Sequence, residues 1–456
     1  MEDLPASVIF EILSRVNDSA DLARCRLVSK TLNALSYEVR SLNLLCSFDR
    51  YLKSRALETK TLITPFKTIF KNLLLKSRNI ESISVGVEKP LQGISDDDVD
   101  DESDDLYLTE VNFVSEWLPE ISGRLRSLSI SDFWIQSCWR RSEVLSVISS
   151  YCHNLAKLEV KNAWLSVEGL KPMSKLTSLT LKFVRLDDED LNKVNDCFLS
   201  LEVLNLIGVG GLREPRIHLL HLKMCQWTVS NAPLSLTIHA PTLTELKLNC
   251  VKPKSLVLET PLLFSLHLSI EKTSEWGMKQ FLNLNSLRIE STDLYNLICL
   301  FPCCKTVEKL MVDSPKLSEQ VEVRREVSFE ALFHVFSNLS SLTLGPGAWL
   351  ELETCFRMEG LKGKSGMKGL REMVAHLVVN KVQITQSFIS RVLDQCTNLF
   401  EMTLLIHRDV DSAIANNLIS CCMADFPRVR WRWGMWKEGT KDTWVCNGVD
   451  SAIQDV

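Results

Sequence analysis

The segment Leu243-Thr-Glu-Leu-Lys-Leu248 decides the fold, because its leucines follow a pattern, apolar-x-x-apolar-x-apolar, that returns at regular intervals. The same unit begins again at Leu263 and at Leu284, after 20 and 21 residues. Alternate side chains of a β-strand point to one face, so positions 246 and 248 would share a face. A strand this short cannot bury that face alone. Stacked copies, in contrast, form a continuous core and a parallel sheet.

Twelve copies of this unit run from residue 125 to residue 404. Their first positions step by 20 to 23 residues between 243 and 307, and by 29 to 32 residues between 307 and 399. The unit and the shorter step resemble the leucine-rich repeat, and the longer step leaves room for a helix. The copies are Leu125-Leu128-Ile130, Leu155-Leu158-Val160, Leu176-Leu179-Leu181, Leu201-Leu204-Leu206, Leu219-Leu222-Met224, Leu243-Leu246-Leu248, Leu263-Leu266-Leu268, Leu284-Leu287-Ile289, Val307-Leu310-Val312, Leu339-Leu342-Leu344, weakly Leu370-Met373-Ala375, and Leu399-Met402-Leu404.

The spacers between copies are of two kinds. Longer spacers at 143–152, 329–336 and 388–393 carry apolar residues three or four apart and predict helices. Between 232 and 270, Pro241 and Pro261 punctuate alternating runs such as 235–239 and 255–259, which predict strands joined by turns. The Asn or Cys of the repeat consensus is absent eight residues after each first position, so we expect an irregular solenoid. Those positions hold Phe133, Ala163, Val184, Val209, Trp227, Val251, Glu271, Thr292, Pro315, Gly347, Val378 and His407.

The first forty residues have a different, helical pattern. Leu4, Val8, Ile12 and Val16 lie four residues apart, with Asp3 as a plausible N-cap and a proline in the first turn. After a break at 17–19, apolar residues resume and predict one or two further short helices. A segment of about forty residues is too short to bury its own apolar face well, and we therefore expect part of that face to bind a partner.

This N-terminal stretch resembles the F-box, the motif by which substrate receptors dock onto the Skp-type adaptor of Skp–cullin–F-box ubiquitin ligases. The matching residues are Leu4-Pro5, Val8-Ile9, Ile12-Leu13-Ser14-Arg15, Leu22-Ala23-Arg24-Cys25-Arg26 and Val28-Ser29-Lys30-Thr31-Leu32-Asn33. Where the family commonly has Trp before the Asn, this chain has Leu32, a smaller anchor that predicts a weaker adaptor contact. The resemblance implies an adaptor-facing or helix-packing set comprising Leu4, Pro5, Val8, Ile9, Ile12, Leu13, Leu22, Val28 and Leu32.

Composition favours a protein without a nucleic-acid or membrane partner. Of the 456 residues, 45% are hydrophobic and 24% charged, and the net charge is −5. Eight acids lie between Asp96 and Asp105, and without them the remainder would carry +3, too little for a dedicated nucleic-acid surface. Fifteen cysteines, an odd number, in a chain of this length do not indicate the disulfide framework of a small scaffold, and no apolar run reaches membrane-spanning length. We therefore expect reduced cysteines and a cytoplasmic or nuclear location.

No catalytic or metal-binding motif is found. The chain has no His-Glu-x-x-His and no Cys-x-x-Cys, so we expect a protein that is not an enzyme and that uses no cofactor or metal. The acidic segment at 94–106 is expected to be a disordered loop, and Ser95 and Ser103 precede aspartates as acidophilic kinases prefer. Near the C-terminus Trp431, Trp433, Trp436 and Trp444 alternate with basic residues, which could stack bases but more often form the terminal cap that an open repeat array needs.

The fold class expected is α/β: an N-terminal helical F-box followed by an irregular leucine-rich-repeat solenoid, with a parallel sheet and helices or loops on its convex side. The domains would be the F-box at 1–45, a linker with first solenoid elements at 46–120, the solenoid at 121–425 and a Trp-rich cap and tail at 426–456. The combination resembles the plant F-box/leucine-rich-repeat proteins. It implies a receptor that holds a client protein near a cullin-bound ubiquitin-charged enzyme. The alternatives are a repeat scaffold without ubiquitin ligase function and a small-molecule-dependent receptor.

Client contacts are expected at polar positions of the repeat strands whose side chains point away from the core. These positions are Lys157, Glu159, Lys182, Glu245, Lys247, His267, Arg288 and Lys309.

Overall fold

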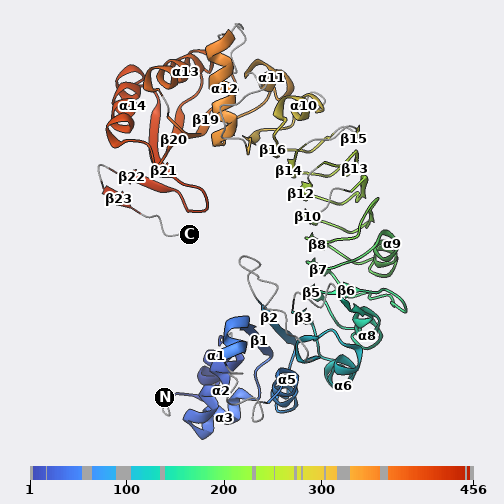
Figure 1. Cartoon of the computed structure of the whole chain (residues 1–456). Coiled ribbons are helices and arrows are strands. Elements are labelled where there is room, and N and C mark those ends of the chain that lie inside the picture. Colours follow the sequence, from blue (N-terminus) through green and yellow to red (C-terminus); the bar gives the residue numbers. More distant parts are fainter. Residues whose placement is uncertain are drawn as a thin grey trace. The chain divides into compact units, whose positions relative to one another are not determined.

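The computed structural model describes residues 4–16, 18–53, 64–88, 104–133, 139–228, 233–250, 252–271, 275–278, 281–301, 304–315, 329–359, 368–379, 381–446 and 449–451. The chain divides into two compact units, Met1–Thr242 and Leu243–Val456, which we describe in turn (Figure 1). In both units the pattern of repeated leucines is a ladder of parallel strands with buried alternate side chains, which confirms the predicted fold class.

Unit 1 begins with three short helices, α1 (Ala6–Ser14), α2 (Ser19–Val28) and α3 (Lys30–Ser36). The carboxylate of Asp18 caps α2 by accepting from the backbone N–H of Ala20 at 2.8 Å, and the Ser29 hydroxyl caps α3. Pro5 does not lie in the first turn as predicted but occupies the position before it, where its carbonyl accepts from the next turn. Asp3 lies outside the described residues.

Seven parallel strands of unit 1 pair in chain order, each with the next. They are β1 (Ser41–Ser47), β2 (Ser82–Glu88), β3 (Ser127–Ser131), β5 (Lys157–Lys161), β7 (Ser178–Lys182), β8 (Val203–Ile207) and β10 (Met224–Thr228). Two of them, β1 and β2, precede the first predicted copy, and β1 begins inside the range predicted for the F-box. Sequence inspection missed β2 because Ile80, Ile83 and Val85 replace the leucines there. It missed β1 because Val39-Leu42-Leu44, which fits the pattern, lies inside the range predicted for the F-box.

One predicted repeat copy is wrong in register. The copy Leu219-Leu222-Met224 places Met224 inward, but Met224 is 44% exposed and pairs with Val203 on the opposite face. The inward residues of β10 are Cys225 and Trp227, both buried, so the copy starts at Leu222. Either Leu219 or Leu222 can serve as the first position of the pattern. The burial of Trp227 shows that the repeat starts at Leu222.

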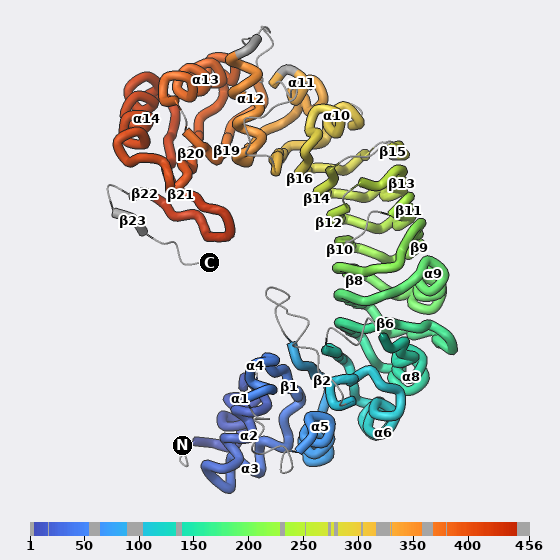
Figure 2. Tube along the Cα trace, viewed as in Figure 1, coloured from blue at the N-terminus to red at the C-terminus, as the bar shows by residue number. Residues whose placement is uncertain are grey.

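The remaining elements of unit 1 connect these strands, and helices α6, α8 and α9 lie on one side of the ladder (Figure 1). Strands β9 and β11 pair with each other beside the main sheet, on the side of α9 (Figure 2). The elements are α4 (Phe48–Lys53), α5 (Phe66–Leu75), the 3-10 turn η3 (Asp104–Leu106), α6 (Val111–Ile121), β4 (Arg141–Ser142), α8 (Val144–Tyr151), β6 (Trp164–Leu165), α9 (Asp188–Cys197), β9 (Arg216–His218) and β11 (Ser235–His239).

Unit 2 continues the same plan with strands that pair in parallel. They are β12 (Glu245–Cys250), β14 (Ser265–Ile270), β16 (Ser286–Glu290), β17 (Lys309–Asp313), β18 (Ser341–Leu344), β19 (Glu372–Leu377), β20 (Glu401–His407) and β21 (Arg430–Trp436). Two antiparallel strands, β22 (Thr443–Cys446) and β23 (Val449–Ser451), follow. The spacers hold β13 (Ser255–Glu259), β15 (Glu275–Met278), α10 (Leu294–Cys299), α11 (Phe329–Val335), α12 (Pro346–Glu359), α13 (Val382–Gln395) and α14 (Ser412–Asp425).

The predicted spacers are confirmed. Helices α8, α11 and α13 cover the three segments with helical spacing, and β11 to β14 are strands joined by turns. The consensus Asn position is apolar and buried in unit 1, at Phe133, Ala163, Val184 and Val209. Each repeat forms one coil of the solenoid, and in these coils apolar packing replaces the hydrogen bonds that the consensus Asn would make.

A different polar ladder joins the coils. In several repeats the residue just before the first apolar position donates a side-chain hydrogen bond to the carbonyl two residues before the first position of the preceding repeat. Examples are Asn338 to the Lys305 carbonyl at 2.8 Å and Asn398 to the Lys368 carbonyl at 2.7 Å. Asn154, Thr242 and Asn283 do the same, to the carbonyls of Gly123, Leu220 and Pro261.

We expect Asn338→Ala/Asn398→Ala to lower the free energy of unfolding by about 2 kcal/mol, near 1 kcal/mol for each lost hydrogen bond. Urea unfolding followed by circular dichroism measures the loss. Asn249→Ala, at an exposed asparagine of β12, is the matched control and should be nearly neutral. Equal effects of the ladder and control substitutions would contradict a stabilising role for the ladder.

Candidate functional site

The three N-terminal helices enclose a small core of their own. Ile9, Leu13, Leu22 and Leu32 are at most 7% exposed and pack together with Val39. Within the predicted adaptor-facing or helix-packing set, these four residues pack the helices together. Leu32 lies in this core, at 7% exposure, and the weaker adaptor contact expected from its smaller side chain stays a prediction.

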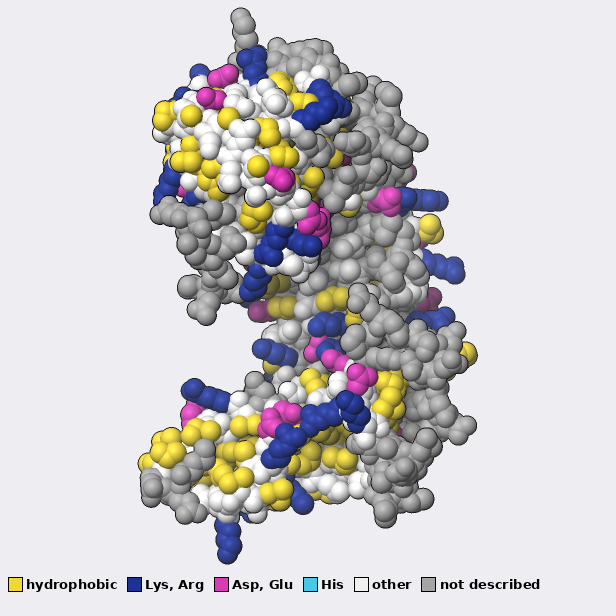
Figure 3. Space-filling view, turned by 60° about the vertical axis from the view of Figure 1, so that its left-hand side comes forward, with side chains coloured by type: hydrophobic (Ala, Val, Ile, Leu, Met, Phe, Trp, Pro, Cys, Tyr) yellow, Lys and Arg dark blue, Asp and Glu magenta, His cyan; other side chains and the backbone are white. Residues whose placement is uncertain are grey.

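A second apolar set on the same helices is exposed. Leu4, Val8 and Ile12 are 40–42% exposed, and Val28 at the end of α2 is 75% exposed. Leu27, which the sequence analysis missed, is 88% exposed. Hydrophobic side chains gather over these helices in the lower part of Figure 3. We call Leu4, Val8, Ile12, Leu27 and Val28 the apolar ridge; an uncovered set of this kind is typical of a protein-binding surface.

The helical module is fixed to the repeats that follow it. The Ser19 hydroxyl accepts from the backbone N–H of Asn43 in β1 at 2.9 Å. Glu38 binds both Arg78, at 3.3 Å, and Asn79, at 2.8 Å. These polar contacts join α2 to β1, and the segment after α3 to the segment before β2, so the apolar ridge has a set orientation relative to the first strands of unit 1.

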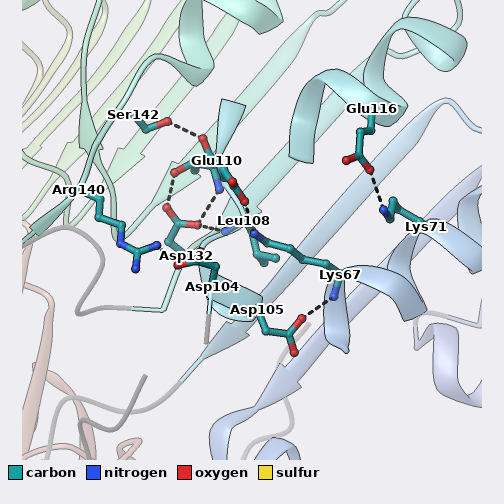
Figure 4. A network of polar contacts seen from close by, with 11 residues as sticks. Lys67, Lys71, Asp104, Asp105, Leu108, Glu110, Glu116, Asp132, Arg140 and Ser142 are labelled. Carbon is teal, nitrogen blue, oxygen red and sulfur yellow. Dashed lines mark hydrogen bonds and ion pairs between the residues drawn. The ribbon is translucent and has the colours of Figure 1, made fainter. Parts of the chain in front are cut away.

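The end of the predicted disordered acidic loop is ordered, which corrects that prediction for residues 104–106. The Asp105 carboxylate accepts from the backbone N–H groups of Phe66, at 2.8 Å, and Lys67, at 3.0 Å, and so caps α5 (Figure 4). Asp104 pairs with Arg140, and Leu106 is buried. Capping and burial outweigh the charge repulsion expected from sequence. Ser95 and Ser103 lie outside the described residues, so their phosphorylation stays a prediction.

A fully buried carboxylate, that of Asp132, lies beside this network (Figure 4). It accepts from the backbone N–H groups of Leu108, at 2.6 Å, and Thr109, at 2.8 Å, and from the Thr109 hydroxyl. Burial raises the pKa of Asp132 to about 7, although these hydrogen bonds and Lys67 favour its charged form. The contacts tie the segment before α6 to the end of β3, which is a structural role.

We call the side of each sheet opposite its buried side chains the open face. In unit 1 it brings together Glu159 and Lys182 of the predicted client-contact set, with Nζ to Oε1 at 2.9 Å. Lys161 adds contacts to Glu159 and to Glu88. Burial raises the pKa of Glu159, but Lys182 and Lys161 outweigh that effect and the pKa is lowered. Lys157 is exposed, and no ion pair to it is found among the described residues.

In unit 2, two residues of the predicted client-contact set contact the same glutamate. His267 and Arg288 both face Glu290, at 3.4 and 2.5 Å, and together they lower the pKa of Glu290 to about 2 despite partial burial. Sequence analysis missed Glu290 because only its neighbours on two strands reveal its role. The remaining predicted residues are exposed on the open face, and no ion pair among the described residues joins them to this group: Glu245, Lys247 and Lys309.

Three of the tryptophans near the C-terminus lie on β21, the last strand of the parallel sheet of unit 2. Trp431 and Trp433 lie on β21 as the alternation predicts, with ring centroids 5.4 Å apart, and β21 pairs with β20. Trp436 lies on the other face, where its indole N–H donates to the Leu377 carbonyl at 3.2 Å. His376 and His407 pack edge-on against this ring. The arrangement closes the last two parallel strands with aromatic side chains, as a cap would.

Within the described ranges, no helix is long and apolar enough to cross a membrane. The same ranges hold no cluster of three His, Cys, Asp or Glu side chains placed to bind a metal ion.

An N-terminal three-helix module with an apolar ridge, followed by a leucine-rich-repeat sheet, defines an F-box protein with a repeat domain. The family model described as F-box-like matches residues 1–42. The chain is 53% identical over 450 residues to the F-box/LRR-repeat protein At4g29420 of Arabidopsis thaliana, an alignment that covers 98% of this chain and all of the relative. The chain therefore belongs to the F-box/LRR-repeat protein family. F-box domains bind Skp-type adaptors, which links the family to the ubiquitin pathway.

Proposed function

We propose that this protein is the substrate-recognition subunit of a Skp–cullin–F-box ubiquitin ligase. The apolar ridge binds the Skp-type adaptor, and the open faces of the repeats bind a client protein. The role is one of tethering, since a client held near the ubiquitin-charged enzyme experiences a raised effective concentration of the thioester. The transfer of ubiquitin to the client is carried out by the other subunits of the ligase.

The observation that carries this proposal is the exposure of the apolar ridge above a complete core. The module buries Ile9, Leu13, Leu22 and Leu32 yet leaves Leu27 and Val28 at 88% and 75% exposure. Since the core is already filled, these side chains add little to the stability of the module itself, and a partner would bury them. The F-box match covers the same helices.

Pull-down of a purified Skp-type adaptor by the full chain tests the proposal. We expect Leu4→Asp/Ile12→Asp to weaken adaptor binding at least tenfold, because two carboxylates would lie at a desolvated apolar contact. Circular dichroism should report an unchanged fold, since both positions are exposed. The matched control is Leu75→Asp/Leu199→Asp, which places the same charges at leucines 70% and 63% exposed outside the F-box helices.

Binding by the native chain and by the control, with loss in the ridge variant, would support ligase assembly. If the native chain does not bind the adaptor, the proposal fails and a repeat scaffold without ligase function remains. Equal binding by the ridge variant would instead place the adaptor contact elsewhere on the module.

A further inference from the structure

The edge at which the strands of unit 1 begin is unevenly charged. Toward one end of this edge Arg40 pairs with Glu81, at 3.5 Å. Toward the other end Lys223 pairs with Glu202, at 3.0 Å. Between these pairs the coils of β3, β5 and β7 carry four exposed cations for which the described residues provide no ion pair. We call these cations the basic edge: Arg124, Arg126, Lys157 and Lys175.

Hydrogen bonds between the coils hold the basic edge together. The Arg126 carbonyl accepts from two backbone N–H groups of the next coil, at 2.8 and 3.0 Å. The side chain of Asn154 accepts from the Lys175 ammonium, at 2.6 Å, and donates to the Gly123 carbonyl, at 2.8 Å. Neighbouring parallel strands lie about 4.8 Å apart, so three successive coils place these cations along roughly 10 Å of the edge.

The charge of Arg124 is not neutralised by its hydrogen bonds. Its guanidinium donates to the Arg78 carbonyl and to the side-chain oxygen of Asn79, at 3.3 Å, and both acceptors are uncharged. Glu120 of α6 lines the same pocket as Arg124 and has no cation partner within the described ranges. The four cations of the basic edge less this one carboxylate leave three positive charges in excess.

A pocket of about 270 Å³ lies between α5 and α6 beside Arg124. Among its polar lining residues, Lys71 of α5 pairs with Glu116 of α6 at 2.7 Å (Figure 4). Its apolar lining includes Leu74, Ile80, Trp117 and Ile121. Sites for small molecules usually enclose about 300 to 1,000 Å³, so this smaller pocket suits one large apolar side chain of a protein.

We propose that the basic edge and this pocket are the docking site for an acidic segment of a client protein. The carboxylates of the segment lie along the basic edge, and a large apolar side chain next to them enters the pocket beside Arg124. Single-stranded nucleic acid would instead need exposed aromatic side chains for stacking, and Trp117 is only 4% exposed. This inference rests on the proposed function as a client receptor and names the chemistry of the client.

Selection of phage-displayed random dodecapeptides on the immobilised full chain tests the site. We expect enriched peptides that combine several Asp or Glu residues with Trp, Phe or Leu. Fluorescence anisotropy of a labelled selected peptide should show at least tenfold weaker binding to Arg126→Glu/Lys157→Glu, because two attractions become repulsions. Added KCl should weaken binding to the native chain and have much less effect on this variant.

Two further variants separate the parts of the site, and circular dichroism checks that each is folded. Lys193→Glu/Arg216→Glu makes the same change of charge at exposed cations of α9 and β9, so the selected peptide should bind it normally. Ser77→Trp adds a large side chain to the lining of the pocket. Peptides selected on it should keep their acidic residues and lose the preference for an apolar one.

Equal binding of the peptide by Arg126→Glu/Lys157→Glu, enrichment of peptides without acidic residues, or no enrichment at all would overturn the proposal. Tighter binding of a labelled random RNA than of the selected peptide would make the basic edge a nucleic-acid surface and would also overturn it. Adaptor pull-down with Arg126→Glu/Lys157→Glu should be normal, and a tenfold loss there would assign the edge to the adaptor instead. A native chain that binds the selected peptide but not the adaptor would keep this docking site and refute ligase assembly.

Discussion

Alanine in place of Gly347 is expected to lower the free energy of unfolding by about 3 kcal/mol. An added Cβ would lie 1.9 Å from the Ser314 carbonyl oxygen, which is a main-chain atom and cannot rotate away. The Gly347 N–H also donates to the Asp313 carboxylate at 3.2 Å, so a shift of the first turn of α12 would lose that contact. Overpacking and the lost contact act together.

Urea unfolding of Gly347→Ala beside Gly123→Ala measures this effect. A Cβ on Gly123 meets no atom within 4 Å, so the control should stay within about 0.5 kcal/mol of the native chain. A Gly347→Ala variant as stable as the control would show that β17 and α12 can separate without cost, contrary to the packing described.

The second large effect concerns Asp132. We expect Asp132→Ala to cost about 3 kcal/mol, because the buried N–H groups of Leu108 and Thr109 lose their acceptor. Asp132→Asn keeps an acceptor oxygen without the charge, so it should fold and should differ from the native chain mainly in its dependence on pH.

The direction of that dependence follows from the raised pKa. In the folded chain the pKa of Asp132 is about 7, above the ordinary 3.8, so the folded state holds the proton more tightly. The contribution of this group is fully present below pH 3.8 and is lost as the pH rises toward 7. Relative to Asp132→Asn, the native chain should lose about 2 to 3 kcal/mol between pH 5 and pH 8.

Chemical unfolding at both pH values, with Asp49→Asn as an exposed control, checks this result. A constant difference between the native chain and Asp132→Asn across that range would mean that Asp132 is charged in the folded state throughout, and that its three hydrogen bonds outweigh burial.

The repeat pattern predicted the strand ladder because leucine spacing and strand periodicity report the same inward face. It failed at 219–224, where Leu219 and Leu222 fit two registers and only the burial of Trp227 decides between them. It also missed β2, where isoleucine and valine replace leucine, and β1, whose Val39-Leu42-Leu44 lies inside the segment predicted as the F-box. A search that gives most weight to leucine and sets the N-terminal helices apart thus detects the regular repeats and loses the first ones.

The candidate docking surface was predictable as a segment but not residue by residue. Spacing put Leu4, Val8 and Ile12 on one stripe, yet an apolar stripe can face a core or a partner, and the core uses the neighbouring stripe of Ile9 and Leu13. Leu27 follows Leu22 by five residues and is out of helical phase with it, so the spacing did not indicate that Leu27 belongs to the docking surface.

The asparagine ladder has a consequence for how this chain tolerates change in length. At the joints where it occurs, the ladder needs only a side-chain donor on one side and a backbone carbonyl on the other, both at fixed offsets from the first apolar residue of their repeats. Repeats of about 20 residues and of about 30 residues both meet this requirement. The hydrogen bond between neighbouring coils therefore does not depend on whether a helix or a short strand connects their sheet strands. Gain or loss of one whole coil would therefore keep a backbone carbonyl opposite each of these donors, whereas a shift of a single residue would displace a donor from its acceptor.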